Sequence, residues 1–235
     1  MIEISIVIPA YNEEKRIIST LKKIKDYLEK EDYRYEIIVV DDGSKDRTSK
    51  IIKKIKEKDN RISLIHFLKN RGKGAAVKEG VLSAKGRYIL FTDSDLSTPI
   101  EELDKLLFWV KERDYDIAIG SRGLPESKIL IPQLWYREKM GKIFNIFVRL
   151  LVVPEIFDTQ CGFKLFRRKI AQHLFHLQRV SNLAFDVEII YLSKSFGYSV
   201  KEIPVHWINS PQSKVHLLSD SLRMLITLIK IFLRH

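Results

Sequence analysis

Two aspartates separated by one residue are the first feature of this sequence that could do chemistry. Asp93 and Asp95 stand in the stretch FTDSDLSTP at residues 91–99, directly after the apolar run RYIL. Two like charges at the end of one strand repel each other unless a cation holds them or both point into water. Mg²⁺ binds oxygen ligands, commonly one or two carboxylates together with substrate phosphates. For this pair alone, a metal site and a pair of solvated acids both remain open.

Three further polar segments stand between apolar runs: VIPAYNEE, VVDDGSKD and NRGKGAA. The first predicts a strand-to-helix turn, with Asn12 as the N-cap and Glu13 and Glu14 in the first helical turn. In the second, Gly43 favours a tight turn and Asp46 is placed to cap the next helix. The third is a basic, glycine-containing helix start that could approach a phosphate closely, although it lacks the P-loop pattern. Each segment is also an ordinary turn when taken alone.

Short apolar strands alternate with amphipathic helices along the first half of the chain. The expected strands are 4–10, 35–42, 61–67, 87–93 and 116–122. The expected helices between them are 13–30, 46–58, 74–84 and 100–112. This alternation predicts an α/β fold with a mostly parallel sheet covered by helices. Ligands of such sheets bind at the carboxyl ends of the strands, where Asp93, Asp95, Ser121 and Arg122 would gather.

The composition describes a chain large enough for one sizeable core. It has 235 residues, one cysteine and a formal net charge of +11. No run of eighteen uncharged apolar residues is present, and the opening MIEISIVIPA reads directly into a strand, so neither a membrane span nor a signal peptide is predicted. The positive charge predicts an anionic partner: nucleic acid, an acidic membrane surface or a phosphorylated substrate. Acids at the ligand edge would repel a polyanion, which disfavours a nucleic-acid-binding module.

The order and spacing of the four polar segments resemble the GT-A fold glycosyltransferases of family 2. Later segments extend the resemblance over nearly the whole chain: GSR at 120–122, DTQCGFKLF at 158–166, AFDVEI at 184–189 and PQSKV at 211–215. These look like the polyprenyl-phosphate glycosyltransferases, most of all the group that makes dolichyl-phosphate β-glucose. The mannosyltransferase relatives have Gln where this chain has Ser97. That difference weakens a GDP-mannose reading and leaves a third side-chain ligand to the metal in doubt.

The resemblance implies an inverting, metal-dependent transfer of a hexose, with glucose from UDP-glucose the favoured donor. A family 2 enzyme acting on a sugar hydroxyl and a GDP-mannose-dependent enzyme remain alternatives. Asp93 would hold the far end of the nucleotide, and Asp95 with Asp93 would bind Mg²⁺ or Mn²⁺. The residues implied to bind the nucleotide sugar are Pro9, Tyr11, Glu13, Asp41, Lys73, Gly74, Asp93 and, closing over the diphosphate, Lys214.

A phosphate acceptor changes what the protein must supply. A phosphate monoester has a second pKa of roughly 6, so near neutrality it is already largely ionised and needs no strong general base. It needs cations instead, and guanidinium groups can bind phosphate through two nitrogens. Arg122 and Arg137, with Ser121 beside Arg122, are therefore expected to hold the acceptor phosphate. Ordinary surface positions for the two arginines remain the alternative.

Three acids in the second half of the chain are expected near the sugar. Asp158 stands in a segment that is typical of a loop, whereas Asp186 and Glu188 lie at an apolar helix start. A buried acid is costly unless it is hydrogen-bonded, which disfavours a merely solvated role for Asp186 and Glu188. Asp158 and Asp186 are predicted to face the sugar and Glu188 to assist, while helix capping is the alternative for Asp186.

Two amphipathic helices are predicted at about 138–153 and 216–235. Each carries one narrow polar stripe on an otherwise apolar surface, as with Thr227 and Lys230 in the second. They could lie in an anionic membrane interface, pack on the sheet or form a dimer contact. The lipid acceptor favours peripheral attachment at the cytoplasmic face of a membrane. The chain is then expected to be one domain, with residues 1–122 binding the nucleotide sugar and 123–235 the acceptor.

Overall fold

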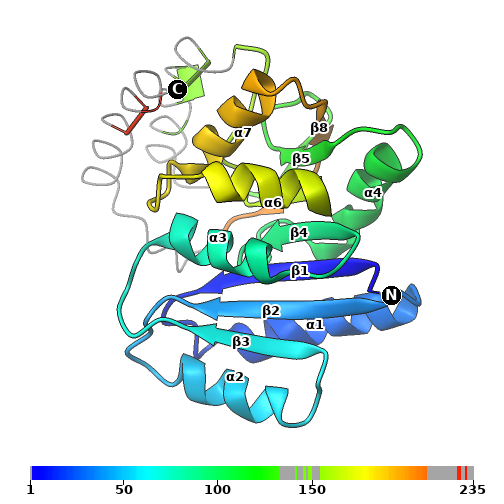
Figure 1. Cartoon of the computed structure of the whole chain (residues 1–235). Helices are drawn as coiled ribbons and strands as arrows, with labels where there is room; N and C mark the ends of the chain where they lie inside the picture. The colour runs from blue at the N-terminus through cyan, green and yellow to red at the C-terminus, as the bar shows by residue number, and fades with distance from the viewer. Residues whose placement is uncertain are drawn as a thin grey trace.

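A single large sheet organises the molecule. The computed structural model describes residues 2–132 and 154–210, together with residues 141, 145, 146, 148, 149, 227, 228 and 231. Within these residues, one sheet has seven strands in the order β3-β2-β1-β4-β7-β5-β8 (Figure 1). Their bounds are β1 Ile4–Ala10, β2 Tyr35–Asp41, β3 Ile62–His66, β4 Tyr88–Thr92, β5 Ile117–Ser121, β7 Phe163–Arg167 and β8 Val200–Pro204. All five expected strands are present, four of them slightly shorter than predicted.

One strand runs against the others. β1 pairs in parallel with β2 and β4, β2 with β3, and β5 with β8. β7 lies between β4 and β5 and is antiparallel to both, so β4 and β5 keep the same direction. The mostly parallel α/β sheet is thus confirmed, and the carboxyl ends of β1, β2, β4 and β5 share one edge. β7 itself was not among the expected strands.

Helices cover both faces of the sheet and fill two cores. α1 (Ile17–Lys30), α2 (Thr48–Lys56) and α4 (Leu103–Lys111) pack on the face to which Ile6 and Ile8 point. The short 3-10 helix η1 (Ile100–Glu102) precedes α4. α3 (Lys73–Ser83), α6 (Arg168–Leu177) and α7 (Phe185–Ser195) pack on the opposite face, to which Val7 points. Figure 1 shows α3, α6 and α7 in front of the sheet and α1 behind it.

The first helix begins later than the sequence predicted. Its buried residues Ile17, Leu21, Ile24 and Leu28 recur at helical spacing and pack on the sheet. Asn12 is not its N-cap, because Asn12 has a φ of 55° and the residue before the helix is Arg16. The prediction of a helix from residue 13 was therefore wrong. The segment between β1 and α1 is a loop that is free to carry site residues.

A small ribbon lies beside the carboxyl edge. β6 (Lys128–Ile131) and β9 (His206–Ile208) form a separate two-stranded parallel sheet. The backbone N–H of Ile208 donates to the carbonyl of Ser97 over 2.7 Å. The ribbon is thereby joined to the loop that carries Asp93 and Asp95.

The described parts of the two expected amphipathic helices are helical and pack on the body. Val148, Leu228 and Ile231 are buried in the core that α6 and α7 share. The Thr227 hydroxyl, on the predicted polar stripe, accepts a hydrogen bond from the Asn182 amide. At these positions the alternative that the helices pack on the domain is confirmed. Most of both segments lies outside the described residues. In the described part of the chain, no helix has the length and apolar character needed to cross a bilayer.

Candidate active site

Hydrogen bonds join the loops that follow β1 and β2. The Asn12 N–H donates to the Ser44 hydroxyl over 2.8 Å, and the Asn12 side chain accepts from the Lys45 N–H at the same distance. The Glu13 N–H donates to the Thr48 hydroxyl over 2.7 Å. These bonds hold Asn12 in a left-handed conformation that few non-glycine residues adopt. The predicted nucleotide-binding loop at residues 11–13 is therefore fixed by its neighbour.

Two consecutive aspartates at the end of β2 have different tasks. Asp41 is fully buried and contacts the His66 ring nitrogen Nδ1 at 2.9 Å. Asp42 accepts the backbone N–H groups of Arg71 and Gly72 over 2.6 and 2.9 Å. Burial raises the pKa of Asp42, although these two bonds oppose the change. Asp42 thereby fixes the loop that leads into α3, which begins at Lys73.

Lys73 reaches across the edge to the first aspartate of the pair. Its Nζ lies 2.6 Å from Oδ1 of Asp93, just beyond β4. Burial opposes the charge on Lys73, but Asp93 and Asp186 outweigh it and raise the pKa of the lysine. The predicted residues Lys73 and Asp93 are thus brought together as an ion pair.

Gly162, the residue before β7, leaves room for the side chain of Asp93. The Asp93 N–H donates to the Gly162 carbonyl over 3.2 Å. A Cβ on Gly162 would lie 2.1 Å from Oδ2 of Asp93, far inside van der Waals contact. Only glycine therefore leaves room for the aspartate in this orientation.

The second aspartate of the pair is held by its own loop. Oδ1 of Asp95 accepts the Ser97 N–H over 3.0 Å. Leu96 between them has a φ of 48°, a strained conformation for a leucine of the kind that concentrates at functional sites. Burial and the charge of Asp93 raise the pKa of Asp95. The carboxylate form of Asp95 is thus disfavoured by its surroundings, as expected of a group that a cation would stabilise.

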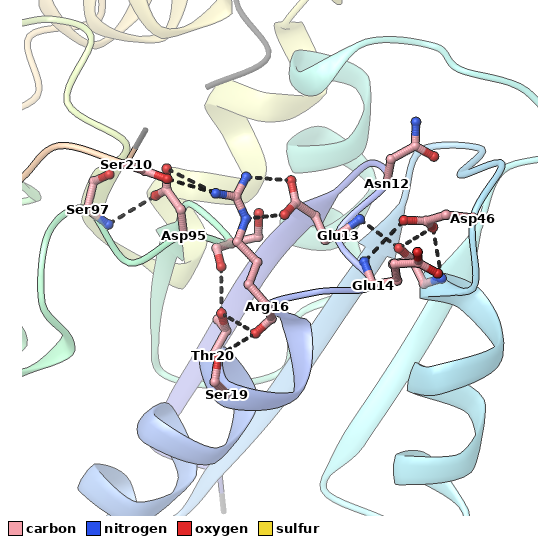
Figure 2. A network of polar contacts seen from close by, with 12 residues as sticks. Asn12, Glu13, Glu14, Arg16, Ser19, Thr20, Asp46, Asp95, Ser97 and Ser210 are labelled. Carbon is pink, nitrogen blue, oxygen red and sulfur yellow. Dashed lines mark hydrogen bonds and ion pairs between the residues drawn. The ribbon is translucent and has the colours of Figure 1, made fainter. Parts of the chain in front are cut away.

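Arg16 lies among the predicted site residues, and sequence reasoning did not single it out. Its guanidinium pairs with both oxygens of Glu13 and donates from Nη1 to the Ser210 hydroxyl over 2.8 Å (Figure 2). The same Nη1 lies 4.0 Å from Oδ2 of Asp95. Arg16 therefore joins the predicted nucleotide loop, the carboxylate pair and the end of the β9 segment. Its place in YNEEKR gave no signal, because it read as an ordinary charged residue on a helix.

A buried ion pair between Lys164 and Asp186 lies close to Lys73 and Asp93. Nζ of Lys164 in β7 contacts Oδ1 of Asp186 at 2.5 Å and also donates to the Cys161 carbonyl over 2.6 Å. Burial raises the pKa of Asp186, against the attraction of Lys164 and Lys73. Asp186 lies in the first turn of α7, so the predicted buried helix start is confirmed. Its lysine partner was not foreseen.

Glu188, the next acid of α7, makes a local structural contact. It is buried, and its carboxylate accepts the backbone N–H groups of Arg179 and Val180, the latter over 2.8 Å. That Asp186 and Glu188 also face a sugar stays a prediction.

Arg122 and Asp158 form a two-bond pair at the end of β5. Nε and Nη2 of Arg122 donate to the two oxygens of Asp158 over 2.6 and 2.9 Å, and the Arg122 N–H adds a third bond of 3.0 Å. Despite burial, Arg122 lowers the pKa of Asp158 to about 2. Glu202 of β8 accepts the N–H groups of Phe157 and Asp158. Among the described residues, no acceptor contacts the remaining nitrogen, Nη1, so the guanidinium is only partly used.

The other predicted residues are placed as follows. Pro9 is buried next to the end of β1, and Gly74, the second residue of α3, leaves no room for a Cβ against Phe185. Ser121 is fully buried, and its hydroxyl accepts the Gly123 N–H over 3.3 Å. Arg137 and Lys214 lie outside the described residues, so their expected roles stay predictions.

The donor set fits a hard divalent cation only in part. Asp93 and Asp95 are two carboxylates at one strand end, and the charge of one raises the pKa of the other. In the described ranges, no group of three or more His, Cys, Asp or Glu side chains could hold a metal. Mg²⁺ and Mn²⁺ accept one or two carboxylates when substrate phosphates complete their coordination. The residues present therefore fit a metal that binds together with a diphosphate.

Comparisons with known proteins agree with this arrangement. Residues 5–175 match the family model described as glycosyl transferase family 2. The chain is 36% identical to a dolichyl-phosphate beta-glucosyltransferase of Dictyostelium discoideum over 245 residues, which cover 100% of this chain and 75% of the relative. It is 38% identical to the Homo sapiens protein of the same name over 225 residues, which cover 91% of this chain and 69% of the relative.

Solved structures are similar in fold. Glucosyl-3-phosphoglycerate synthase of Mycobacterium tuberculosis, crystallised with uridine diphosphate, superimposes with a TM-score of 0.72 at 17% identity, covering 98% of this chain and 80% of that chain. S. aureus TarS with UDP-GlcNAc gives a TM-score of 0.58 at 21% identity, covering 97% and 66%. At such identities the likeness shows the fold alone, and that fold is the predicted GT-A fold.

Proposed function

The chain belongs to glycosyltransferase family 2, and from this we propose that it transfers glucose from UDP-glucose to dolichyl phosphate or another polyprenyl phosphate, inverting the anomeric carbon. The observation that carries the proposal is the 36–38% identity, over most of the chain, to proteins named dolichyl-phosphate beta-glucosyltransferase. The carboxyl edge supports it, because the carboxylate pair lies beside two cations there. Glycosyl transfer itself follows from the family.

The donor would lie along the carboxyl ends of β1, β2 and β4. Asp41, Glu13 and Tyr11 would line the pocket for the base, with Pro9 and Gly74 giving it shape. Asp93 and Asp95 would hold Mg²⁺ or Mn²⁺, which neutralises negative charge on the leaving diphosphate. Mn²⁺ and UDP together in the M. tuberculosis synthase support this choice.

The protein's own cations would assist departure of the diphosphate. Lys73 and Arg16 both border the carboxylate pair, at 2.6 Å from Asp93 and 4.0 Å from Asp95. A group whose interaction strengthens as the diphosphate gains charge stabilises the transition state more than the ground state. Lys214 would add a third cation on the same side.

The acceptor would approach from the side of β5 and the β6–β9 ribbon. Asp158 occupies two nitrogens of Arg122, so Arg122 would present Nη1 to the acceptor phosphate rather than its whole fork. Arg137 would supply the second cation, and buried Ser121 would shape the turn. Asp158 would then act by orienting Arg122. No general base is required, because the phosphate is already ionised.

The two halves of the chain would divide these tasks. Residues 1–122 would bind the nucleotide sugar and residues 123–235 the lipid phosphate, in a single domain attached peripherally to the cytoplasmic face of a membrane. The basic composition supports contact with an anionic surface.

A donor and acceptor screen tests the proposal. The full chain is incubated with Mn²⁺, a short polyprenyl phosphate and, in turn, UDP-glucose, UDP-N-acetylglucosamine and GDP-mannose, and products are weighed by mass spectrometry. We expect glucose linked to the polyprenyl phosphate as the product from UDP-glucose. No product is expected when polyprenol replaces polyprenyl phosphate. Preferred transfer from GDP-mannose would contradict the donor, and transfer to a free hydroxyl would contradict the acceptor.

A further inference from the structure

A basic pocket lies at the edge of the sheet opposite the carboxylate pair. It has a volume of about 440 Å³, and five cationic side chains line it: Lys85, Arg87, Arg167, Arg168 and Lys169. They come from the turn before β4, the end of β7 and the start of α6. Tyr88 pairs with Arg167 across the two strands, so the pocket spans a strand junction. Asp93 stands five positions after Tyr88 along the chain, which places the pocket roughly 15 Å from the carboxylate pair.

Two of these cations are held in place by backbone carbonyls. Arg168 donates from Nη1 to the Lys85 carbonyl over 2.6 Å. Arg167 donates to the carbonyls of Tyr115 and Val110 over 3.1 and 2.7 Å. Both guanidinium groups are half-buried, so the pocket wall is formed in advance of any ligand.

The other three cations are exposed and have no carboxylate partner among the described residues. The acids at this end of the sheet have other partners. Glu3 pairs with Lys111 over 2.7 Å, and Asp116 accepts a hydrogen bond from the Ser199 hydroxyl over 2.9 Å. Asp114 pairs with Arg167, and Glu36 accepts the Lys85 N–H rather than its ammonium group. Lys85, Arg87 and Lys169 therefore add uncompensated positive charge around one hollow. Repulsion among them is relieved when an anion binds.

The start of α6 strengthens this reading. Arg168 and Lys169 stand in the first helical turn, which holds no acidic residue and no capping side chain. The positive end of the helix dipole disfavours cations there and favours a bound anion. The two cations in this turn therefore destabilise the helix, and a bound anion would offset that destabilisation.

We propose that this pocket is a second anion site that binds phosphoryl groups, separate from the catalytic edge. Arginine and lysine together suit phosphate oxygens, because guanidinium supplies paired donors and ammonium a compact charge. The phosphoryl group belongs either to a soluble phosphate compound or to an anionic lipid headgroup. Both sources present the same oxygens to the pocket.

The test compares two variants with the same loss of charge. One carries Lys85→Gln, Arg87→Gln and Lys169→Gln. The other carries Lys53→Gln, Lys54→Gln and Lys56→Gln, three exposed residues of α2 that do not line this pocket. Inorganic pyrophosphate is titrated calorimetrically into each full-length protein without divalent cations, so that the carboxylate pair does not recruit it through a metal. Thermal unfolding midpoints show that both variants are folded.

We expect the pocket variant to bind pyrophosphate about tenfold more weakly or worse, and the α2 variant to match the unmodified protein. Equal weakening in both variants, or no binding by the unmodified protein, would overturn the site. Co-sedimentation with phosphatidylcholine vesicles, with or without phosphatidic acid, then separates the sources. Loss of acidic-vesicle binding in the pocket variant alone assigns the site to lipid headgroups, and unchanged vesicle binding with lost pyrophosphate binding assigns it to a soluble phosphate.

Discussion

At the scale of single residues, the site depends on acids held close to cations. Lys73 contacts Asp93, Lys164 contacts Asp186, and Arg16 lies between Glu13 and Asp95 (Figure 2). Each pairing reduces the repulsion that two neighbouring carboxylates would otherwise suffer. The question raised by Asp93 and Asp95 in the sequence is therefore answered by cations from α3 and from the loop before α1. A metal with a diphosphate would add to this balance.

Asp95→Asn should abolish metal-dependent transfer without harming the fold. Burial and Asp93 raise the pKa of Asp95, so the native state disfavours its charged form and loses no stability when the charge is removed. We expect Mn²⁺-dependent turnover to fall at least about a hundredfold, with an unfolding midpoint equal to or above that of the unmodified protein. Calorimetric Mn²⁺ binding in the presence of UDP provides the second measurement. Near-normal turnover would remove Asp95 from the metal site.

Gly162→Ala should displace Asp93. The added methyl group would lie 2.1 Å from the carboxylate, which must turn away from Lys73. We expect transfer to fall by about one to two decades, because the loss of a charge-assisted contact costs roughly 1.5–3 kcal/mol. Gly141→Ala is the matched control, because a Cβ there meets nothing within 4 Å in the part of the chain that the structure describes. Equal activities in the two variants would show that Asp93 needs no such room.

At the scale of elements, the loop before β7 is fixed by charge, which gives it a pH dependence. Arg122 lowers the pKa of Asp158 to about 2, from an ordinary value of 3.8. A carboxyl whose folded pKa is depressed stabilises the protein above its unfolded pKa. That contribution is lost as the pH falls from about 4 to about 2.

Asp158→Asn should therefore be less stable by on the order of 2 kcal/mol at neutral pH, and the difference should shrink below about pH 4. Urea unfolding at a series of pH values measures it. Asp114→Asn is the control, because that carboxylate also pairs with an arginine but is 93% exposed. A difference that stays constant down to pH 2 would mean that the ion pair contributes nothing through its charge.

Sequence reasoning foresaw the elements built from local patterns. The five strands from β1 to β5, the helices between them and the gathering of Asp93, Asp95 and Arg122 at one edge follow from apolar periodicity and chain order. β7 was missed because Lys164 interrupts its apolar run and because its pairing with β4 and β5 joins residues far apart in sequence. A lysine in a buried strand makes sense only beside Asp186, which the sequence places 22 residues later.

The partners of the site residues were harder to foresee than the residues themselves. DSD and DTQCGF stood out as polar groups between apolar runs. That Arg122 would be bound by Asp158, or Arg16 by Glu13, depends on how β5, β8 and the β1 loop meet in space. The sequence led us to expect that the whole guanidinium of Arg122 would be available, whereas only its Nη1 is. The difference arises because tertiary contacts decide which side chains pair.

At the scale of the whole molecule, charge is distributed unequally between the two edges of the sheet. The carboxyl edge combines acids with cations that nearly balance them. The opposite edge holds the basic pocket, whose exposed Lys85, Arg87 and Lys169 have no carboxylate partner among the described residues and contribute to the net charge of +11. This protein would then bind phosphoryl groups in two ways. At the carboxyl edge it would use a metal together with Lys73 and Arg16, and at the opposite edge it would use cationic side chains alone.

The reactivity of Cys161 reports the stability of the sheet at its carboxyl edge. Cys161 is the single cysteine, it is buried, and burial raises the pKa of its thiol to about 11. Alkylation requires an exposed thiolate, so iodoacetamide should react slowly with the native protein at neutral pH and rapidly after unfolding in urea. Cys161→Ser should not react at all.

Ligand binding should slow that reaction further. The Cys161 carbonyl receives Lys164, and the adjoining Gly162 packs on Asp93, so opening of this segment disturbs the carboxylate pair. A ligand that binds only the closed form adds about 2.7 kcal/mol of stability at a hundred times its dissociation constant, equivalent to roughly a hundredfold slower alkylation. We expect UDP with Mn²⁺ to have this effect and Mn²⁺ alone to have less, because two carboxylates bind the ion weakly without phosphate. An alkylation rate unchanged by saturating UDP and Mn²⁺ would place the nucleotide away from Asp93.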